Sequence, residues 1–89
     1  MIAFDDVDEA LNIANDTIYG LAASIWTRDL NTAHRFIREI QAGVVWVNTF
    51  DEGDMTQPFG GYKQSGNARD NCMDSVRSYT QEKSAWIRL

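Results

Sequence analysis

The sequence predicts an α/β fold in which a small parallel sheet is built in βαβαβ order. Segments of strand and helix character alternate along residues 2–47, with short connections between them. The spacing of the apolar residues changes from segment to segment, from short unbroken runs to a period of three and four. This alternation is typical of parallel strands joined by crossover helices.

The first strand and the first helix lie at the N-terminus. Ile2 to Phe4 have the character of a short strand or of the tail of one. Asp6 can accept hydrogen bonds from free N–H groups at a helix start, and Glu9 can reach back to complete a capping box. One face of this helix is apolar, with Val7, Ala10, Leu11 and Ala14 at helical spacing. The helix ends at Asn15, and Gly20 marks a turn.

The second strand, second helix and third strand follow. Leu21 to Thr27 form a short, nearly continuous apolar run, which predicts a strand buried on both faces. Arg28 and Asp29 end it. The next segment has apolar residues at helical spacing: Leu30, Ala33, Phe36, Ile37 and Ile40. Gly43 stands where a glycine just past a helix end is expected, and Val44 to Val47 have the strongest strand composition in the chain.

The remaining residues have a different character. Thr49 to Gly66 contain four glycines, the only proline and three acids, and show neither period. A loop of this length is usually functional or disordered. A short helix is expected over Asn71 to Ser78, and an extended segment over Tyr79 to Leu89. No linker or repeat divides the chain, so one domain is expected over residues 1–89.

Composition excludes several classes of function. The chain has 89 residues and a formal net charge of −5, whereas nucleic-acid binding needs clustered Lys and Arg. No apolar run approaches the roughly 20 residues that span a bilayer. No basic and apolar leader is present at the N-terminus, and the single cysteine leaves no intrachain disulfide. We therefore expect a cytoplasmic protein with no nucleic-acid or membrane partner.

Three acids mark the loop as a candidate site. In an open parallel sheet, sites form beyond the carboxyl ends of the strands, where Asn48 and the following loop would lie. Asp51, Glu52 and Asp54 fall within four positions and could attract a cationic group. A solvated loop rim is the plainer interpretation of the same residues, and composition alone favours it.

Other residues do not form a recognisable catalytic or metal-binding pattern. The glycines around Gly60 and Gly61 fit neither a P-loop nor a dinucleotide fingerprint, so we expect them to allow a tight turn. Cys72 is the only thiol and has no evident base, because the single histidine, His34, lies on a predicted helix. The spacing needed for a zinc or calcium site is absent. Three tryptophans fall in predicted strands, where packing is the ordinary role.

Several motifs resemble the aldehyde dehydrogenase superfamily, in its order and at its spacing over essentially the whole chain. The most specific is Pro58-Phe59-Gly60-Gly61-Tyr62-Lys63-Gln64-Ser65-Gly66, which we call the signature loop. Three further matches are Asn15 to Asp29, Ala42 to Asn48, and Tyr79-Thr80-Gln81-Glu82-Lys83. The resemblance implies a small βαβαβ piece of the catalytic domain in residues 1–78 and a C-terminal oligomerisation strand in residues 79–89.

The resemblance also implies a substrate class. The loop and the segment Gly66-Asn67-Ala68-Arg69-Asp70 are most similar to enzymes that oxidise amino-aldehydes such as γ-glutamyl-γ-aminobutyraldehyde. In that family the loop lines the substrate entrance, which makes Phe59 an aromatic wall. Asp51, Glu52 and Asp54 would then favour cationic aldehydes.

The family's catalytic residues are not matched in this chain. Its nucleophilic cysteine, glutamate base, asparagine oxyanion donor and NAD(P)-binding domain all precede the matched region, and Cys72 follows the signature loop. We therefore expect no catalytic residue, no bound cofactor and no activity from the chain alone. An enzyme that uses Cys72 is the least favoured alternative, because neither a base nor a cofactor cradle accompanies it.

The expected role is that of a C-terminal fragment of an NAD(P)-dependent aldehyde dehydrogenase. Unpaired strand edges would favour a homo-oligomer. The alternative is a free-standing oligomerisation or binding module that docks onto itself or onto a full-length relative. The C-terminal strand is compatible with that second role.

Overall fold

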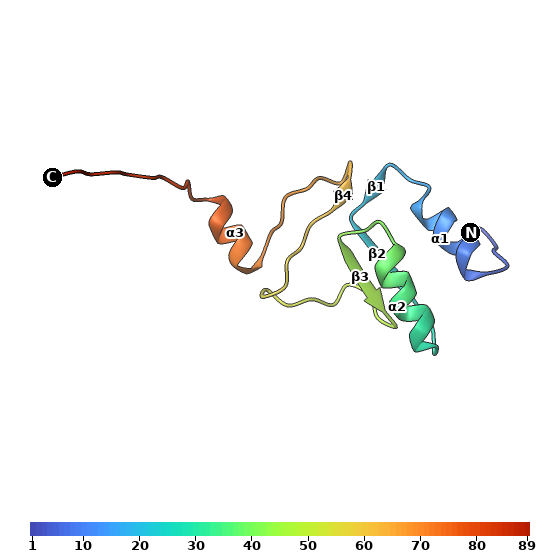
Figure 1. The fold of residues 1–89 in the computed structure, drawn as a ribbon. Helices are drawn as coiled ribbons and strands as arrows, with labels where there is room; N and C mark the ends of the chain where they lie inside the picture. The colour runs from blue at the N-terminus through green and yellow to red at the C-terminus, as the bar shows by residue number, and fades with distance from the viewer.

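The computed structural model describes residues 1–89 and places most of the regular structure at one end of an elongated molecule (Figure 1). Its long dimension is 71 Å, against 25 and 21 Å in the other directions. The elements in chain order are α1 (Val7–Asn15), β1 (Tyr19–Gly20), β2 (Ala22–Ile25), α2 (Leu30–Glu39), β3 (Val44–Val47), β4 (Tyr62–Lys63) and α3 (Cys72–Ser78). None of the helices is long and apolar enough to cross a membrane.

A parallel β2–α2–β3 unit forms the centre of the fold. The two strands pair in register from Ala22 opposite Val44 to Ile25 opposite Val47. Asp29 begins α2 by accepting hydrogen bonds from the backbone N–H groups of Asn31 (3.2 Å) and Thr32 (3.0 Å). The predicted α/β class is confirmed by this unit.

The core lies between helices α1 and α2 and one face of the β2–β3 sheet. Its buried members are Leu11, Phe36, Ile40 and Ala42, and the half-buried residues Val7, Ala23, Ile25 and Val45 pack against them. Ala23 and Ile25 alternate along β2, as expected for a strand with one covered face. An ion pair between Asp8 and Arg35 joins α1 to α2 at the surface. The capping box predicted for α1 is present in part. The Glu9 N–H donates to Asp6 Oδ1 at 2.8 Å, but Glu9 Oε2 accepts from the Asp5 N–H, one residue before the cap.

The sheet is smaller than predicted at both ends of the chain. Ile2 to Phe4 form no strand, and Ile2 is 69% exposed, because no neighbouring strand in this chain pairs with them. The segment from Leu21 to Thr27 is not buried on both faces, since helices cover one side only. Trp26 lies beyond the end of β2 and is 64% exposed. The residues after α3 are extended without strand pairing, so the strand expected there is not formed within this chain.

An antiparallel pair between β1 and β4 was missed by the sequence patterns. Tyr19 lies opposite Lys63, and Gly20 lies opposite Tyr62. The Lys63 ammonium donates to the backbone oxygens of Asn15 (2.7 Å) and Thr17 (3.0 Å), at the end of α1. These contacts return the far end of the long loop to the main body of the molecule. The rest of the predicted loop has no regular structure, as expected.

Gly43 has a different role from the one predicted. Helix α2 ends at Glu39 and is capped by Ile40, so Gly43 is not the glycine of a helix end. A Cβ atom at position 43 would lie 1.7 Å from the backbone oxygen of Gly60. Glycine is therefore required because the signature loop packs directly against the start of β3.

Candidate functional site

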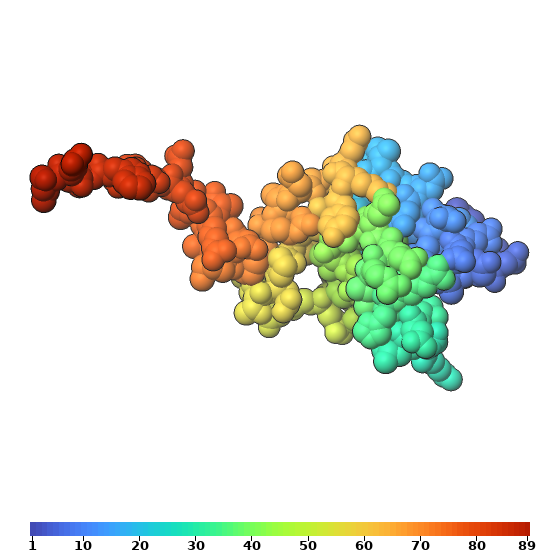
Figure 2. All heavy atoms as spheres, viewed as in Figure 1, coloured from blue at the N-terminus to red at the C-terminus, as the bar shows by residue number.

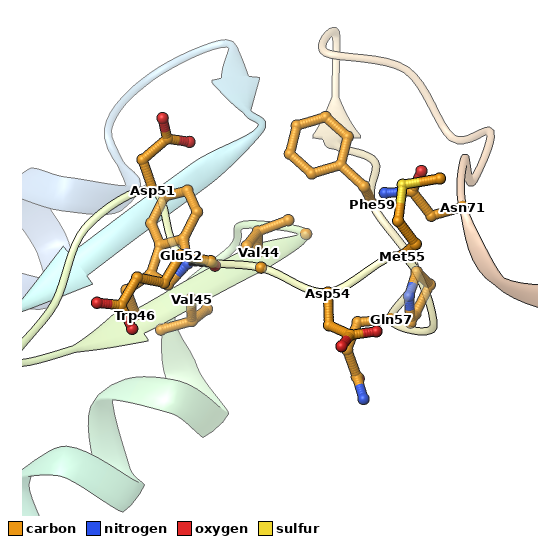
Figure 3. A pocket seen from close by; sticks show the side chains of 13 residues that line it. Val44, Val45, Trp46, Asp51, Glu52, Asp54, Met55, Gln57, Phe59 and Asn71 are labelled. Carbon is orange, nitrogen blue, oxygen red and sulfur yellow. Dashed lines mark hydrogen bonds between the residues drawn. The ribbon is translucent and has the colours of Figure 1, made fainter.

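A cavity of about 560 Å³ opens beside β3, between that strand and the loop that follows it (Figure 3). Its lining comes from three segments: Gly43, Val44, Val45 and Trp46; Asp51, Glu52, Gly53, Asp54, Met55, Gln57, Pro58 and Phe59; and Asn71. All four residues predicted for the substrate entrance, Asp51, Glu52, Asp54 and Phe59, are among them. The fold thus brings the predicted residues together around one hollow.

The first wall of the cavity is β3 and the turn after it. The Trp46 indole N–H donates to the backbone oxygen of Glu52 at 2.6 Å, and the Trp46 and Phe50 rings lie 5.4 Å apart. Asn48 follows the strand with a positive φ of 58°, a conformation that asparagine tolerates. Its side chain bonds both backbone groups of Thr27, which aligns the carboxyl ends of β2 and β3. The loop leaves the carboxyl end of β3 as predicted, but it turns back along the strand, so the cavity lies beside Gly43 to Trp46 rather than beyond the strand ends.

The three acids do not converge on one point. In Figure 3 the carboxylates of Asp51, Glu52 and Asp54 point in different directions. No cluster of three metal-ligating side chains is formed. Asp54 Oδ1 accepts hydrogen bonds from the Thr56 hydroxyl (2.6 Å) and backbone N–H (2.7 Å), and these bonds lower the pKa of Asp54. The acids therefore give the cavity rim negative charge without forming a chelating site.

The second wall is the loop segment that carries Met55 and Phe59. Phe59 and Asp70 exchange two backbone hydrogen bonds of 2.9 and 2.7 Å. The Cys72 N–H donates to the Met55 oxygen at 2.9 Å. Asn71 lies between these two ties and completes the wall (Figure 3). Sequence reasoning missed Asn71 because its place depends on pairing across the loop.

The two glycines near this wall differ in role. A Cβ atom on Gly61 would lie 2.5 Å from the Ser65 side chain, across a turn in which the Ser65 N–H donates to the Tyr62 oxygen at 3.1 Å, as the predicted tight turn requires. Neither Gly60 nor Gly61 has a positive φ, and only Gly66 does, at 97°. A Cβ atom on Gly60 would lie 2.1 Å from the Ala68 oxygen. Close packing of two chain segments, rather than a tight turn, therefore requires glycine at position 60.

The cavity lining includes neither the thiol nor the histidine of the chain. Cys72 and His34 are not among its lining residues, and His34 is exposed on α2. Carboxylates, an amide pair and apolar side chains make up the functional groups of the lining. The arrangement can hold and orient an organic molecule, with the carboxylates and the two amides as its polar contacts.

Comparison with known proteins identifies the family of the chain. The profile of the aldehyde dehydrogenase family matches residues 1–85. The chain is 55% identical over 86 residues to the aminoacetaldehyde dehydrogenase of Pseudomonas aeruginosa, which covers 96% of this chain and 17% of that protein. The chain therefore spans about one sixth of the length of the curated relatives it matches.

Solved structures give the same result. The γ-glutamyl-γ-aminobutyraldehyde dehydrogenase of Burkholderia cenocepacia superposes with a TM-score of 0.84 at 62% identity, over 88% of this chain and 16% of that one. The indole-3-acetaldehyde dehydrogenase of P. syringae, solved in complex with NAD+ and IAA, superposes with a TM-score of 0.88 at 57% identity, over 97% of this chain and 17% of that one. Sequence and structure agree over nearly the whole chain, which belongs to the aldehyde dehydrogenase family.

Proposed function

We propose that the residues lining the cavity beside β3 form the substrate-entrance wall of an NAD(P)-dependent aldehyde dehydrogenase, an enzyme that oxidises aldehydes to carboxylic acids. One observation carries the proposal: Asp51, Glu52, Asp54 and Phe59 surround a single cavity beside β3, in a chain whose residues 1–85 match the family. The cavity joins apolar walls to a few polar groups, which is the usual composition of a small-molecule site. Phe59 acts as the aromatic wall.

The proposed substrates are amino-aldehydes. Two of the relatives described above are named for such substrates, and the third is named for an uncharged aromatic aldehyde. The three carboxylates at the rim favour the cationic class, because negative charge around a cleft concentrates cations near it. A protonated amine at the far end of the aldehyde would remain near the rim while the carbonyl group enters.

The chain is proposed to be inactive alone and to bind no cofactor by itself. The family's reaction requires attack by a thiolate and transfer of a hydride to NAD(P), and the cavity residues include no thiol. Purified chain mixed with aminoacetaldehyde and NAD or NADP is expected to produce no NADH or NADPH. Turnover that disappears in Cys72→Ala would contradict this.

A chimeric enzyme tests the substrate proposal. The chain would replace the matching 86 residues of the P. aeruginosa aminoacetaldehyde dehydrogenase. Neutralising Asp51, Glu52 and Asp54 together is expected to raise KM for aminoacetaldehyde by roughly threefold to a hundredfold, since each exposed charge contributes about 0.2–1 kcal/mol. The effect is expected to vanish for propionaldehyde and to shrink at high salt.

The matched control is Asp5→Asn, which removes an exposed acid outside the cavity. Equal changes in KM for the charged and uncharged aldehydes would reject the charge argument. A chimera that folds but has no activity would reject the proposed role of the segment.

A second candidate role is supported by the C-terminal residues. Figure 2 shows this segment projecting from the molecule without neighbours, and Trp86 is 96% exposed. An extended, unpaired segment that exposes several large apolar side chains favours pairing with another chain. We therefore propose a homo-oligomer, or docking onto a full-length relative, with residues 79–89 as the contact. The proposed compartment is the cytoplasm, because the single cysteine leaves no intrachain disulfide.

A further inference from the structure

A half-buried arginine lies behind the second wall of the cavity. The Arg69 guanidinium donates to the backbone oxygens of Gly61 and Ala68, both at 2.9 Å. It also lies over the Tyr62 ring, with its central carbon 5.6 Å from the ring centroid. The guanidinium thus contacts two segments of the loop. It bonds to Gly61 and stacks on Tyr62 in one, and it bonds to Ala68 in the other.

The contacts of Arg69 flank the residue that faces the cavity. The backbone of Phe59 pairs with that of Asp70, the residue after Arg69. The next residue, Gly60, packs against the Ala68 oxygen. The Arg69 side chain therefore lies beside the isolated bridge that joins Phe59 to Asp70, and it ties the residues on either side of that bridge together. No salt bridge to Arg69 is formed, so its interactions with backbone oxygens and an aromatic face are the ones that place it.

We propose that Arg69 is a positioning residue that fixes Phe59 against the cavity and thereby sets the enzyme's affinity for its aldehyde. The inference rests on the proposed function. Arg69 is not among the residues that line the cavity, so it acts through the wall rather than on the substrate. A wall that contacts the non-reacting part of the aldehyde binds ground state and transition state alike. Its displacement therefore raises KM and leaves kcat nearly unchanged.

The test uses the chimera described above and a double-mutant cycle. Arg69→Gln is expected to raise KM for the aldehyde by about tenfold, the loss of roughly one charge-assisted hydrogen bond. Phe59→Ala is expected to raise KM as well. Because Arg69 acts through Phe59, the double variant should resemble Phe59→Ala alone. Multiplicative effects of the two substitutions would overturn the proposal.

Two further pairs of variants separate positioning from general destabilisation. Tyr62→Phe keeps the aromatic face beneath the guanidinium and should retain the original KM, whereas Tyr62→Leu should raise it. Arg77→Gln is the matched arginine control, because Arg77 is exposed on α3 and pairs only with Asp74. A fall in kcat with unchanged KM in Arg69→Gln would also refute the assignment.

The chimera distinguishes the two levels of the argument. An active chimera in which Arg69→Gln has no effect leaves the proposed function intact and rejects the role of Arg69. A folded but inactive chimera rejects both. In the 89-residue chain itself, amide hydrogen exchange at Phe59 and Asp70 should become faster in Arg69→Gln and remain unchanged in Arg77→Gln. Unchanged exchange at both amides would count against the proposed role of Arg69 beside this bridge.

Discussion

At the residue scale, neighbouring acids of one loop have different surroundings. Asp54 is occupied by its two hydrogen bonds from Thr56. Asp51 has a positive φ of 57°, so its backbone is held in a conformation that few residues adopt. Glu52 is held through its backbone oxygen, which accepts from Trp46. Equal charge therefore does not mean an equal role, and the carboxylates of Asp51 and Glu52 are the ones free to face an approaching cation.

The hydrogen bonds of Asp54 predict a pH effect. Its pKa is lowered first by the Thr56 hydroxyl and then by the Thr56 N–H. A carboxyl whose pKa is lower in the folded state stabilises the fold above its ordinary value of 3.8. That contribution is lost as the pH falls through the lowered pKa. Thr56→Val removes the larger cause, so the pKa of Asp54 should rise toward the ordinary value.

The measurement is a carbon-13 NMR titration of the side-chain carboxyl groups. Asp29 provides an internal control, because its pKa is lowered mainly by Thr32 and should not change in Thr56→Val. An Asp54 titration that is identical in the two proteins would show that the hydroxyl does not hold the carboxylate.

At the element scale, local signals were sufficient for some elements and not for others. Helix α1 was predicted because Asp6 and Glu9 cap it through residues three apart. Strand β3 was predicted from four β-branched and aromatic residues in succession. Strand β4 was missed because its partner, β1, lies more than forty positions earlier in the chain. The strand expected at Ile2 failed for the converse reason, since its residue types fit a strand but no partner is present.

The residues of the candidate site also fall into two groups, those that the local sequence predicts and those that depend on contacts between distant segments. The loop that contains Asp51 and Phe59 was predicted, first from its acids and then from its resemblance to the family. Asn71 and Arg69 were not singled out, because their importance comes from contacts across the loop, with Phe59 and Gly61 on the other side. A sequence pattern reports neighbours within a few residues, whereas this wall is built by contacts between segments eight to seventeen residues apart.

The contact between β3 and the signature loop gives a prediction for Gly43→Ala. The added methyl group would overlap the Gly60 oxygen, which lies 1.7 Å from its ideal position. Strand and loop must separate, at an expected loss of about 1–3 kcal/mol in the free energy of unfolding. Gly53→Ala is the matched control, because a Cβ atom there meets nothing within 4 Å. Urea unfolding measures both variants, and equal midpoints would disprove the close contact.

At the scale of the whole molecule, the chain exposes more surface than its mass requires. Its accessible surface is 7761 Å², against roughly 5,300 Å² for a compact monomer of the same mass. Its radius of gyration is 18.0 Å, against about 12 Å for a compact domain of this length. The difference in area, roughly 2,500 Å², is comparable to a large protein interface. The extended residues after α3 account for much of the length (Figure 1).

This excess surface predicts self-association of the 89-residue chain. The apolar residues exposed in the C-terminal segment include Trp86, Ile87 and Leu89, and their burial against a second copy would be favourable. Sedimentation velocity at micromolar concentrations should show dimers or larger species. Trp86→Ser combined with Ile87→Ser should weaken association by about a hundredfold or more, because each loses roughly 1.5–3 kcal/mol of potential burial.

Leu30→Ser is the control for that experiment, since Leu30 is an apolar residue at the start of α2 that is 70% exposed and lies outside the C-terminal segment. Association that weakens as much in this control would indicate nonspecific contact over the whole surface rather than pairing of the C-terminal segment. A single monomeric species in the unmodified chain would instead show that the extended residues remain solvated without a partner. That result would reject self-association through residues 79–89. Docking onto a full-length relative would then be the better explanation of this segment.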